Sequence, residues 1–171
     1  MRATLPARPS RRARGGQTLA VRVSAKSEYA IRAMVELAAA GEGPVKGERI
    51  SRQQDIPVKF LENIMVDLRQ GGLVRSQRGT DGGYWLARPA EAINLAQVMR
   101  AVDGPIANVR GLRPEEVSYP GRAESLRRVW VAVRASVRLV LESVTLADLI
   151  AGELPAAVET LLADEEAWLP H

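Results

Sequence analysis

Apolar residues recur at helical spacing from residue 25 onward. The first set follows the order i, i+3, i+4, i+7 and i+8 and consists of Ala30, Ala33, Met34, Leu37 and Ala38. This spacing predicts an amphipathic helix that ends at Gly41. Two more helices are predicted, over residues 46–54 and 58–70, with a short turn between them. Helix, helix, short turn, helix is the order of a helix-turn-helix unit.

The predicted helix over 58–70 has two contrasting faces. Its apolar arc consists of Val58, Leu61, Ile64, Met65 and Leu68. Lys59, Asn63 and Gln70 point the opposite way, and Phe60 and Glu62 flank them. Such a face suits an ordinary solvated surface or a surface that reads base edges, and the helical pattern alone leaves both open.

Two short runs of alternating apolar and polar residues follow this helix. "LVRSQ" and "GYWLA" predict strands, and "RGTDG" between them predicts the turn of a hairpin. Gly79, Gly82 and Gly83 permit positive-φ backbone and close approach to another surface, with Arg78 at the tip. A hairpin after a candidate recognition helix indicates a winged helix. Arg78 would enter a minor groove or clamp a phosphate, or it is a solvated side chain on a plain turn.

Beyond the hairpin, the sequence predicts three further helices. Asn94 and Gln97 form a capping pattern that opens a helix ending at Asp103, and Thr145 with Asp148 caps another. Between them, residues 122–144 predict a long helix with an apolar stripe. We assign to a dimer interface Leu126, Val129, Trp130, Val133, Val137, Val140 and Leu141. The stripe could pack on the chain's own first helix, but its length and the large Trp130 favour a two-fold pair.

Charge is unevenly distributed along the 171 residues, whose net charge is +4. Residues 1–24 hold six arginines and no acid, residues 44–90 hold eight basic and five acidic residues, and residues 91–171 hold eight basic and twelve acidic residues. Residues 1–20 are predicted to be disordered. They form a basic arm on DNA, an organellar targeting segment, or an extension created by the choice of start site; the last is favoured, because the ordered pattern begins near Val21.

Several longer segments carry a family resemblance. "SAKSEYAIRAMVELA", "IPVKFLENIMVDLRQGGLVRSQRGTDGGYWLARP", "INLAQVMRAVDGP" and "ESVTLADL" resemble the Rrf-two family of bacterial winged-helix transcriptional regulators over residues 21–150. The resemblance implies a mainly α fold, a winged helix-turn-helix with a two-stranded wing and a long C-terminal dimerisation helix. It also implies a cytoplasmic homodimer that binds a pseudo-palindromic double-stranded DNA operator.

The resemblance assigns DNA-binding roles to six positions. The base-reading stretch of the recognition helix contains Lys59, Phe60, Glu62 and Asn63, and the wing contributes Arg78 and Gly79. A glutamate can accept a hydrogen bond from a cytosine amino group, and an arginine suits a narrow groove. Lys59 and Phe60 depart from the serine and tyrosine common in the family, so the operator sequence does not transfer.

The sequence lacks the chemistry with which well-known family members sense their signal. They hold an iron–sulfur cluster through three cysteines between the post-wing helix and the dimer helix, here residues 104–121. This chain has no cysteine, and its one histidine is the last residue. We therefore predict no cofactor and no metal, with Glu28 structural or solvated and metal binding by Asp103, Glu115 and Glu116 disfavoured. A small molecule or a partner protein near residues 105–121 remains open as co-regulator, as does constitutive DNA binding.

These observations predict a transcriptional regulator, most simply a repressor, divided along the chain into five parts. The parts are a basic extension or mis-assigned start (1–20), the winged helix-turn-helix (21–90), the post-wing helix and sensor-like loop (91–121), the dimerisation helix with a short helix (122–151), and a tail (152–171). No nucleophile–base pair or phosphate loop indicates an enzyme, and no apolar run indicates a membrane span. The alternative is a winged-helix adaptor that has lost DNA binding, which the net charge of −2 after residue 24 favours.

Overall fold

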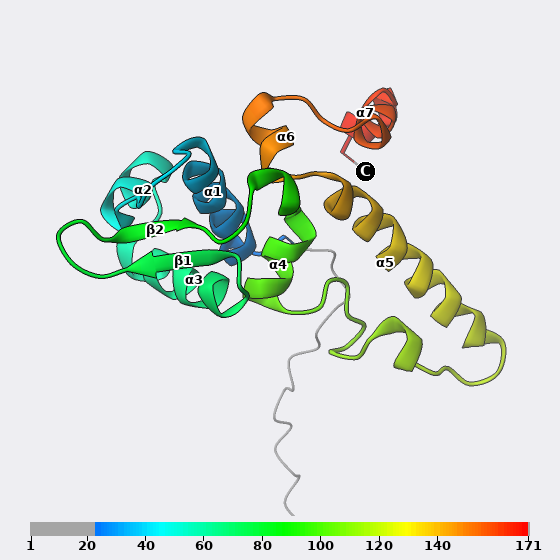
Figure 1. The fold of residues 1–171 in the computed structure, drawn as a ribbon. Helices are drawn as coiled ribbons and strands as arrows, with labels where there is room; N and C mark the ends of the chain where they lie inside the picture. Colours follow the sequence, from blue (N-terminus) through cyan, green and yellow to red (C-terminus); the bar gives the residue numbers. More distant parts are fainter. Residues whose placement is uncertain (1–22, 171) are drawn as a thin grey trace, which may run out of the picture.

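The computed structural model describes residues 23–170, so the predicted extension over 1–20 lies outside the described residues. The elements are α1 (Ala25–Ala39), α2 (Gly47–Gln54), α3 (Val58–Gln70), β1 (Val74–Gln77), β2 (Gly83–Leu86), η1 (Ala90–Ala92), α4 (Leu95–Asp103), η2 (Pro114–Glu116), η3 (Gly121–Glu124), α5 (Ser125–Ser143), α6 (Leu146–Ala151), α7 (Ala156–Leu162) and η4 (Glu165–Trp168). Figure 1 shows α1 to α4 and the hairpin gathered into one body. This is the predicted mainly α fold with a two-stranded sheet.

The core forms where α1, α2 and α3 meet. From α1 it takes Ala30, Ala33, Met34 and Leu37, from α2 Ile50, and from α3 Leu61, Ile64, Met65 and Leu68. The residues from α1 and α3 are those that the helical spacing predicted, with Ala38 half-buried beside them. Val58 is the exception, because it lies in the first turn of α3 and is 45% exposed. The first turn of α3 lies outside the core, so the predicted apolar arc includes one residue too many.

Polar contacts near its start connect α1 to α3 and α4. Ser27 is fully buried, and its Oγ donates to a carboxylate oxygen of Asp103 at 2.6 Å, at the end of α4. Lys26 forms an ion pair with Asp67 of α3 at 2.7 Å. The start of α1 is thereby joined to α3 on one side and to α4 on the other.

The wing is built from β1 and β2, which pair antiparallel with Val74 opposite Leu86 and Gln77 opposite Gly83. Val45, just before α2, forms an isolated antiparallel bridge with Tyr84 of β2. Its N–H donates to the Tyr84 carbonyl at 2.8 Å, and the Tyr84 N–H donates back at 2.9 Å. A Cβ on Gly83 would lie 2.6 Å from the Val45 carbonyl oxygen, so glycine is required for this approach. The predicted hairpin is confirmed, and its base is anchored to the chain ahead of α2.

Both predicted capping patterns are present. Asn94 accepts from the Gln97 N–H at 3.0 Å at the start of α4, and Thr145 accepts from the Asp148 N–H at 3.2 Å at the start of α6. In each pattern the second residue's side chain accepts from the first residue's N–H, which completes a capping box. Backbone hydrogen bonds between the two caps place the starts of α4 and α6 side by side.

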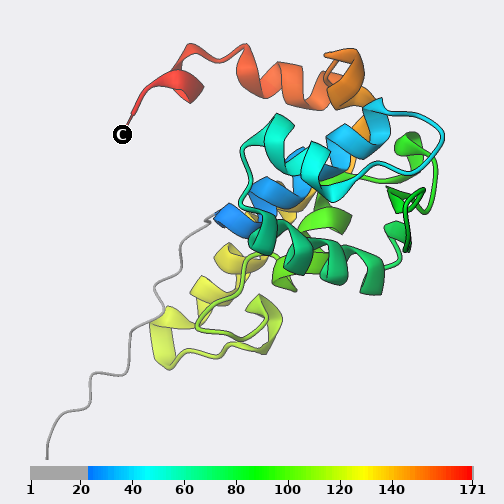
Figure 2. The ribbon, with the colours of Figure 1, turned by 90° about the vertical axis from the view of Figure 1, so that its left-hand side faces the viewer.

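The long helix α5 runs away from the winged-helix body (Figures 1 and 2). It begins at Ser125 rather than at residue 122, because Gly121–Glu124 form a 3-10 turn ahead of it. Its partners within the chain are α4, α7, η2 and η3, whereas α1 packs against α2, α3, α4, α6 and β2. None of the 19 residues of α5 is buried. The described fold therefore does not bury the apolar stripe of α5 against the first helix.

The chain ends in α7 and η4 (Figure 2). Pro155 precedes α7, and Val158 is the buried residue of that helix. Within residues 23–170, no helix is long and apolar enough to cross a membrane.

Candidate nucleic-acid interface

The outer face of α3 presents polar side chains to solvent. Lys59 has a side chain 91% exposed, and its Nζ donates to Glu62 Oε2 at 3.1 Å. Asn63 and Gln70 are exposed on the same helix. The predicted face of hydrogen-bonding residues is therefore present, with the difference that Lys59 and Glu62 pair with each other.

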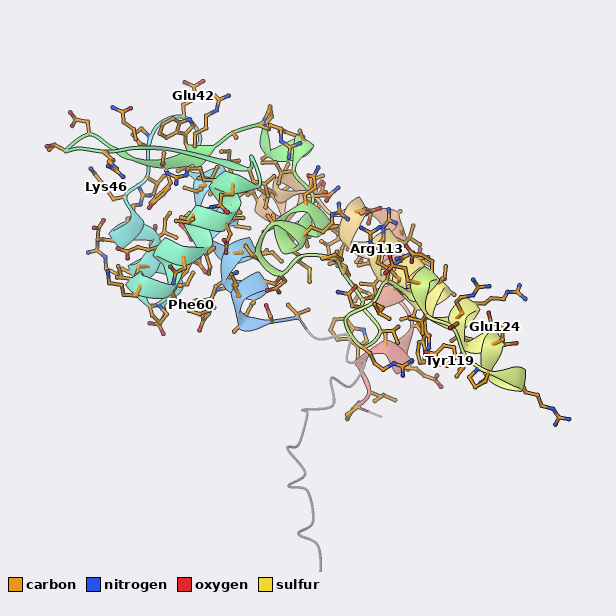
Figure 3. All side chains as sticks on the ribbon, turned by 90° about the horizontal axis from the view of Figure 1, so that it is seen from below. Glu42, Lys46, Phe60, Arg113, Tyr119 and Glu124 are labelled. Atoms are coloured by element: carbon orange, nitrogen blue, oxygen red, sulfur yellow. The ribbon has the colours of Figure 1, made fainter. Side chains whose placement is uncertain are left out.

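Phe60 lies at the edge of this face rather than at its centre. Its ring packs edge-to-face on Tyr29 of α1, with 5.6 Å between the ring centroids. Tyr29 in turn lies under the Arg32 guanidinium at 5.4 Å. Phe60 keeps 39% of its surface exposed, so it can offer an apolar edge while α1 holds its orientation (Figure 3).

The wing tip carries Arg78 and Gly79, both exposed. Lys46, which precedes α2, donates from Nζ to the Gly79 carbonyl at 3.2 Å and also to the Thr80 carbonyl. Figure 3 shows Lys46 beside the hairpin. Gly79 has φ +106°, which favours glycine, and a Cβ on Gly82 would lie 2.2 Å from the Gln77 carbonyl oxygen. Gly79 therefore provides the positive φ of the turn, and Gly82 allows the close approach of the backbone within the loop.

A cleft of about 430 Å³ separates α3 from the wing. Glu62 lines it from α3, and Arg78 and Gly79 line it from the wing. Lys59, Phe60 and Asn63 do not line the cleft. The structure therefore brings together three of the six predicted DNA-binding residues, and places the other three on the neighbouring outer surface of α3.

The sequence analysis did not identify several basic residues that lie close to the predicted DNA-binding residues. Lys46 and Arg69 also line the cleft between α3 and the wing. Arg69, Arg75, Arg88 and Trp85 also line a shallow surface hollow beside β1. The excess of basic residues over 44–90 was a signal for such a patch, but it did not say which residues would gather.

The predicted dimerisation residues do not share one environment. Leu126 and Val129 are 40% and 48% exposed, whereas Trp130, Val133, Val137, Val140 and Leu141 are half-buried. The Trp130 indole N–H donates to the Tyr119 hydroxyl at 2.9 Å. Leu139, which the prediction did not include, is 63% exposed. Leu126 and Val129 lie on the predicted stripe, whereas Leu139 lies about 140° around the helix from Leu126, outside that stripe.

The carboxylates considered as metal ligands all have protein partners. Asp103 accepts from Ser24 and Ser27, Glu115 pairs with Arg134 at 2.5 Å, and Glu116 accepts from the Arg113 N–H at 3.1 Å. Glu28 pairs with Arg32 at 3.4 Å. Among residues 23–170, no three His, Cys, Asp or Glu residues form a group that could hold a metal ion.

A helix-turn-helix followed by a wing, with basic and hydrogen-bonding side chains on the exposed faces of both, defines the class of DNA-binding transcription regulators. Residues 23–152 match the family model of Rrf2, described as an iron-dependent transcriptional regulator, and the chain belongs to this family. The predicted resemblance and the main functional interpretation are thereby confirmed.

Individual relatives agree with this assignment. A Mycobacterium tuberculosis protein assigned as an HTH-type transcriptional regulator, Rv1287, is 49% identical over 148 residues, which cover 86% of this chain and 92% of that protein. CymR of Bacillus subtilis is 37% identical over 75% of this chain and 89% of its own. The solved structure of B. subtilis CymR, titled the global cysteine regulator, aligns with a TM-score of 0.66 at 34% identity, covering 78% of this chain and 98% of CymR.

The family description implies iron, and the donor atoms of this chain test that implication. Iron–sulfur clusters are held by cysteine thiolates, with histidine in some positions. The sequence has no cysteine, and its one histidine is residue 171. The residues present therefore do not fit a thiolate-bound cluster.

Proposed function

We propose that the chain is a repressor that binds a two-fold-symmetric operator as a homodimer. In each half-site α3 enters the major groove and the wing enters the flanking minor groove. The observation that carries this proposal is the cleft between α3 and the wing. The proposed reading helix lies on one side of it and Arg78 on the other. The hydrogen bond from Lys46 to Gly79 holds the wing in this position relative to the helices.

The proposed contacts follow the chemistry of each side chain. Base edges would be read by Lys59, Phe60, Glu62 and Asn63, and the minor groove by Arg78, with Gly79 allowing close approach. Arg69, Arg75 and Arg88 would contact phosphates, which position the protein without reading sequence. The net negative charge after residue 24 does not oppose this, because Lys46, Arg69 and Arg78 line the cleft between α3 and the wing.

The proposed homodimer pairs α5 with α5 of a second copy. A 19-residue helix that buries none of its residues leaves Leu126 and Val129, at the start of the predicted stripe, exposed in one chain. A two-fold interface would cover them and would set two reading helices on successive turns of duplex, about 34–36 Å apart. Such a protein would act in the cytoplasm, where the chromosome lies. A small-molecule or protein co-regulator would contact the segment over 104–121.

Genome-wide footprinting followed by binding titrations tests the proposal. The expected result is a set of pseudo-palindromic sites, bound by a species of twice the chain mass, with affinity falling steeply as salt rises. An adaptor without DNA binding would remain on a protein partner, show little salt dependence and leave no footprint. A strictly monomeric chain that protects no genomic fragment would overturn both the operator and the dimer.

A further inference from the structure

A separate cavity, distinct from the cleft and the hollow near the wing, lies on the side of the molecule away from the wing. It has a volume of about 470 Å³, is open to solvent, and is bordered by the end of α4, the loop that follows it and α5. Four guanidinium groups line it, from Arg100, Arg113, Arg134 and Arg138. The loop contributes an apolar surface from Pro105 and Ile106.

The carboxylates beside this cavity neutralise only half of its positive charge. Glu142 pairs with Arg100 at 2.9 Å and with Arg138 at 3.0 Å, and Glu115 pairs with Arg134 at 2.5 Å. Hydrogen bonds from Arg138 and then Arg100 lower the pKa of Glu142, so this carboxylate is charged at neutral pH. Four arginines against these two glutamates leave an excess of two positive charges; Glu116, which accepts from the Arg113 backbone N–H at 3.1 Å, lies outside the lining.

Arg113 is the arginine of this cavity that takes part in none of these ion pairs. Within residues 23–170 it forms no ion pair, and it lies on the exposed loop with its donors available. Ala107 and Arg110, at φ +56° and +54°, lie in the same loop between Ile106 and Arg113 of the lining and do not line the cavity themselves; they are two of the three non-glycine residues with positive φ in the described chain. Non-glycine residues in this conformation gather at ligand clamps, where surrounding structure holds them.

We infer that this cavity binds a small organic dianion, carrying either a phosphate or a pair of carboxylates. Guanidinium groups match both anions with paired N–H donors, and a dianion balances the excess charge. The volume is that of a metabolite site, and the Pro105 and Ile106 surface would accept a short carbon skeleton.

The position of the cavity gives this site a route to the DNA interface, a step that rests on the proposed function. Its two walls are α4, joined to α1 through Asp103 and Ser27, and α5, the proposed dimerisation helix. A bound dianion removes repulsion among the four arginines and sets the angle between α4 and α5. That angle fixes the spacing of the two reading helices, so occupancy changes operator affinity.

Calorimetric and thermal-shift titrations of the full chain with phosphate and with succinate, at constant ionic strength and without DNA, test the site. Neutral succinamide serves as the control ligand. We expect saturable binding of at least one dianion by the wild type, and at least tenfold weaker binding after Arg113→Gln combined with Arg138→Gln. Arg122→Gln combined with Arg128→Gln removes the same charge outside the cavity and should leave binding unchanged.

The outcomes separate the possibilities. Binding of phosphate alone, of succinate alone or of both supports the site and identifies the anion. Equal weakening by the two double variants, or no binding of either dianion beyond the ionic-strength control, overturns it. Arg113→Gln alone breaks no described ion pair and gives the same test if the double variant fails to fold. Operator binding with and without the dianion is a separate measurement, so failure to bind DNA would refute the proposed function and leave the anion result standing.

Discussion

The ammonium group of Lys46 donates a hydrogen bond to the carbonyl oxygen of Gly79 at 3.2 Å, joining the residue before α2 to the tip of the wing. The contact spans 33 residues of sequence and lies beside the cleft that Glu62 and Arg78 flank. It makes the wing position depend on the helix-turn-helix, because a two-stranded hairpin has little stability of its own.

Loss of this contact should loosen the wing. Lys46→Met removes one charged hydrogen-bond donor, a change of about 1 kcal/mol that corresponds to roughly fivefold weaker operator binding. Tryptic cleavage after Arg78 should become faster at the same time. Lys46→Arg keeps the charge and a donor, and it should retain most of the affinity; equal proteolysis of wild type and Lys46→Met would contradict the anchoring role.

Arg78→Ala should weaken operator binding by about tenfold and reduce the slope of log affinity against log salt by about one. The reason is the loss of a guanidinium from the minor groove or from a phosphate. Fluorescence anisotropy at several salt concentrations measures both effects. Arg122→Ala, on the turn before α5, is the matched control, and identical affinities of wild type and Arg78→Ala would remove the wing assignment.

Glu62→Ala should act on specificity more than on affinity. The exposed carboxylate can accept from one cytosine amino group, and such a contact discriminates by about 1–3 kcal/mol. Its loss also frees Lys59, now paired with Glu62 at 3.1 Å, for a phosphate. Selection from randomised operators should show relaxed preference at one base pair per half-site, whereas unchanged preference at every position would place Glu62 outside the base-reading set.

Leu126→Glu should convert the proposed dimer to a monomer, since a charge would be placed within the apolar surface of α5. Light scattering coupled to size exclusion should report a halved mass, and operator affinity should fall with it. Ser125→Glu introduces the same side chain one position earlier, on an exposed polar residue, and should leave the mass unchanged. A Leu126→Glu protein that keeps the wild-type mass would exclude this part of α5 from the interface.

The cap of α6 should make stability sensitive to acid. The Thr145 N–H at 2.7 Å, and then the Thr145 hydroxyl, lower the pKa of Asp148 below its usual 3.8. A carboxyl with a lower pKa in the folded state stabilises the fold above its unfolded pKa, and this contribution disappears as pH falls through the folded value. Asp148→Asn should flatten the fall in melting temperature between about pH 5 and pH 3, while Glu153→Gln should not.

Local patterns in the sequence were enough to predict the elements and their order. The spacing of Met34 and Leu37, the Asn94 and Thr145 capping boxes, and the glycines of the hairpin each act within a few residues, where periodicity and capping chemistry apply directly. The Rrf2 family followed from the same segments. The six predicted DNA-binding residues and the α5 stripe were likewise placed on their elements from local pattern and resemblance, and their roles stay predictions.

Only the tertiary structure decided which distant residues meet. The Lys46 contact with the wing, the bridge between Val45 and Tyr84, the exposure of Val58 and the half-burial of Trp130 all depend on the angles between elements. The cavity of four arginines depends on them too, because its walls come from residues 100 to 138. Those angles arise from packing among side chains far apart in the chain, and hydrophobic periodicity specifies which face of a helix is covered but not what covers it.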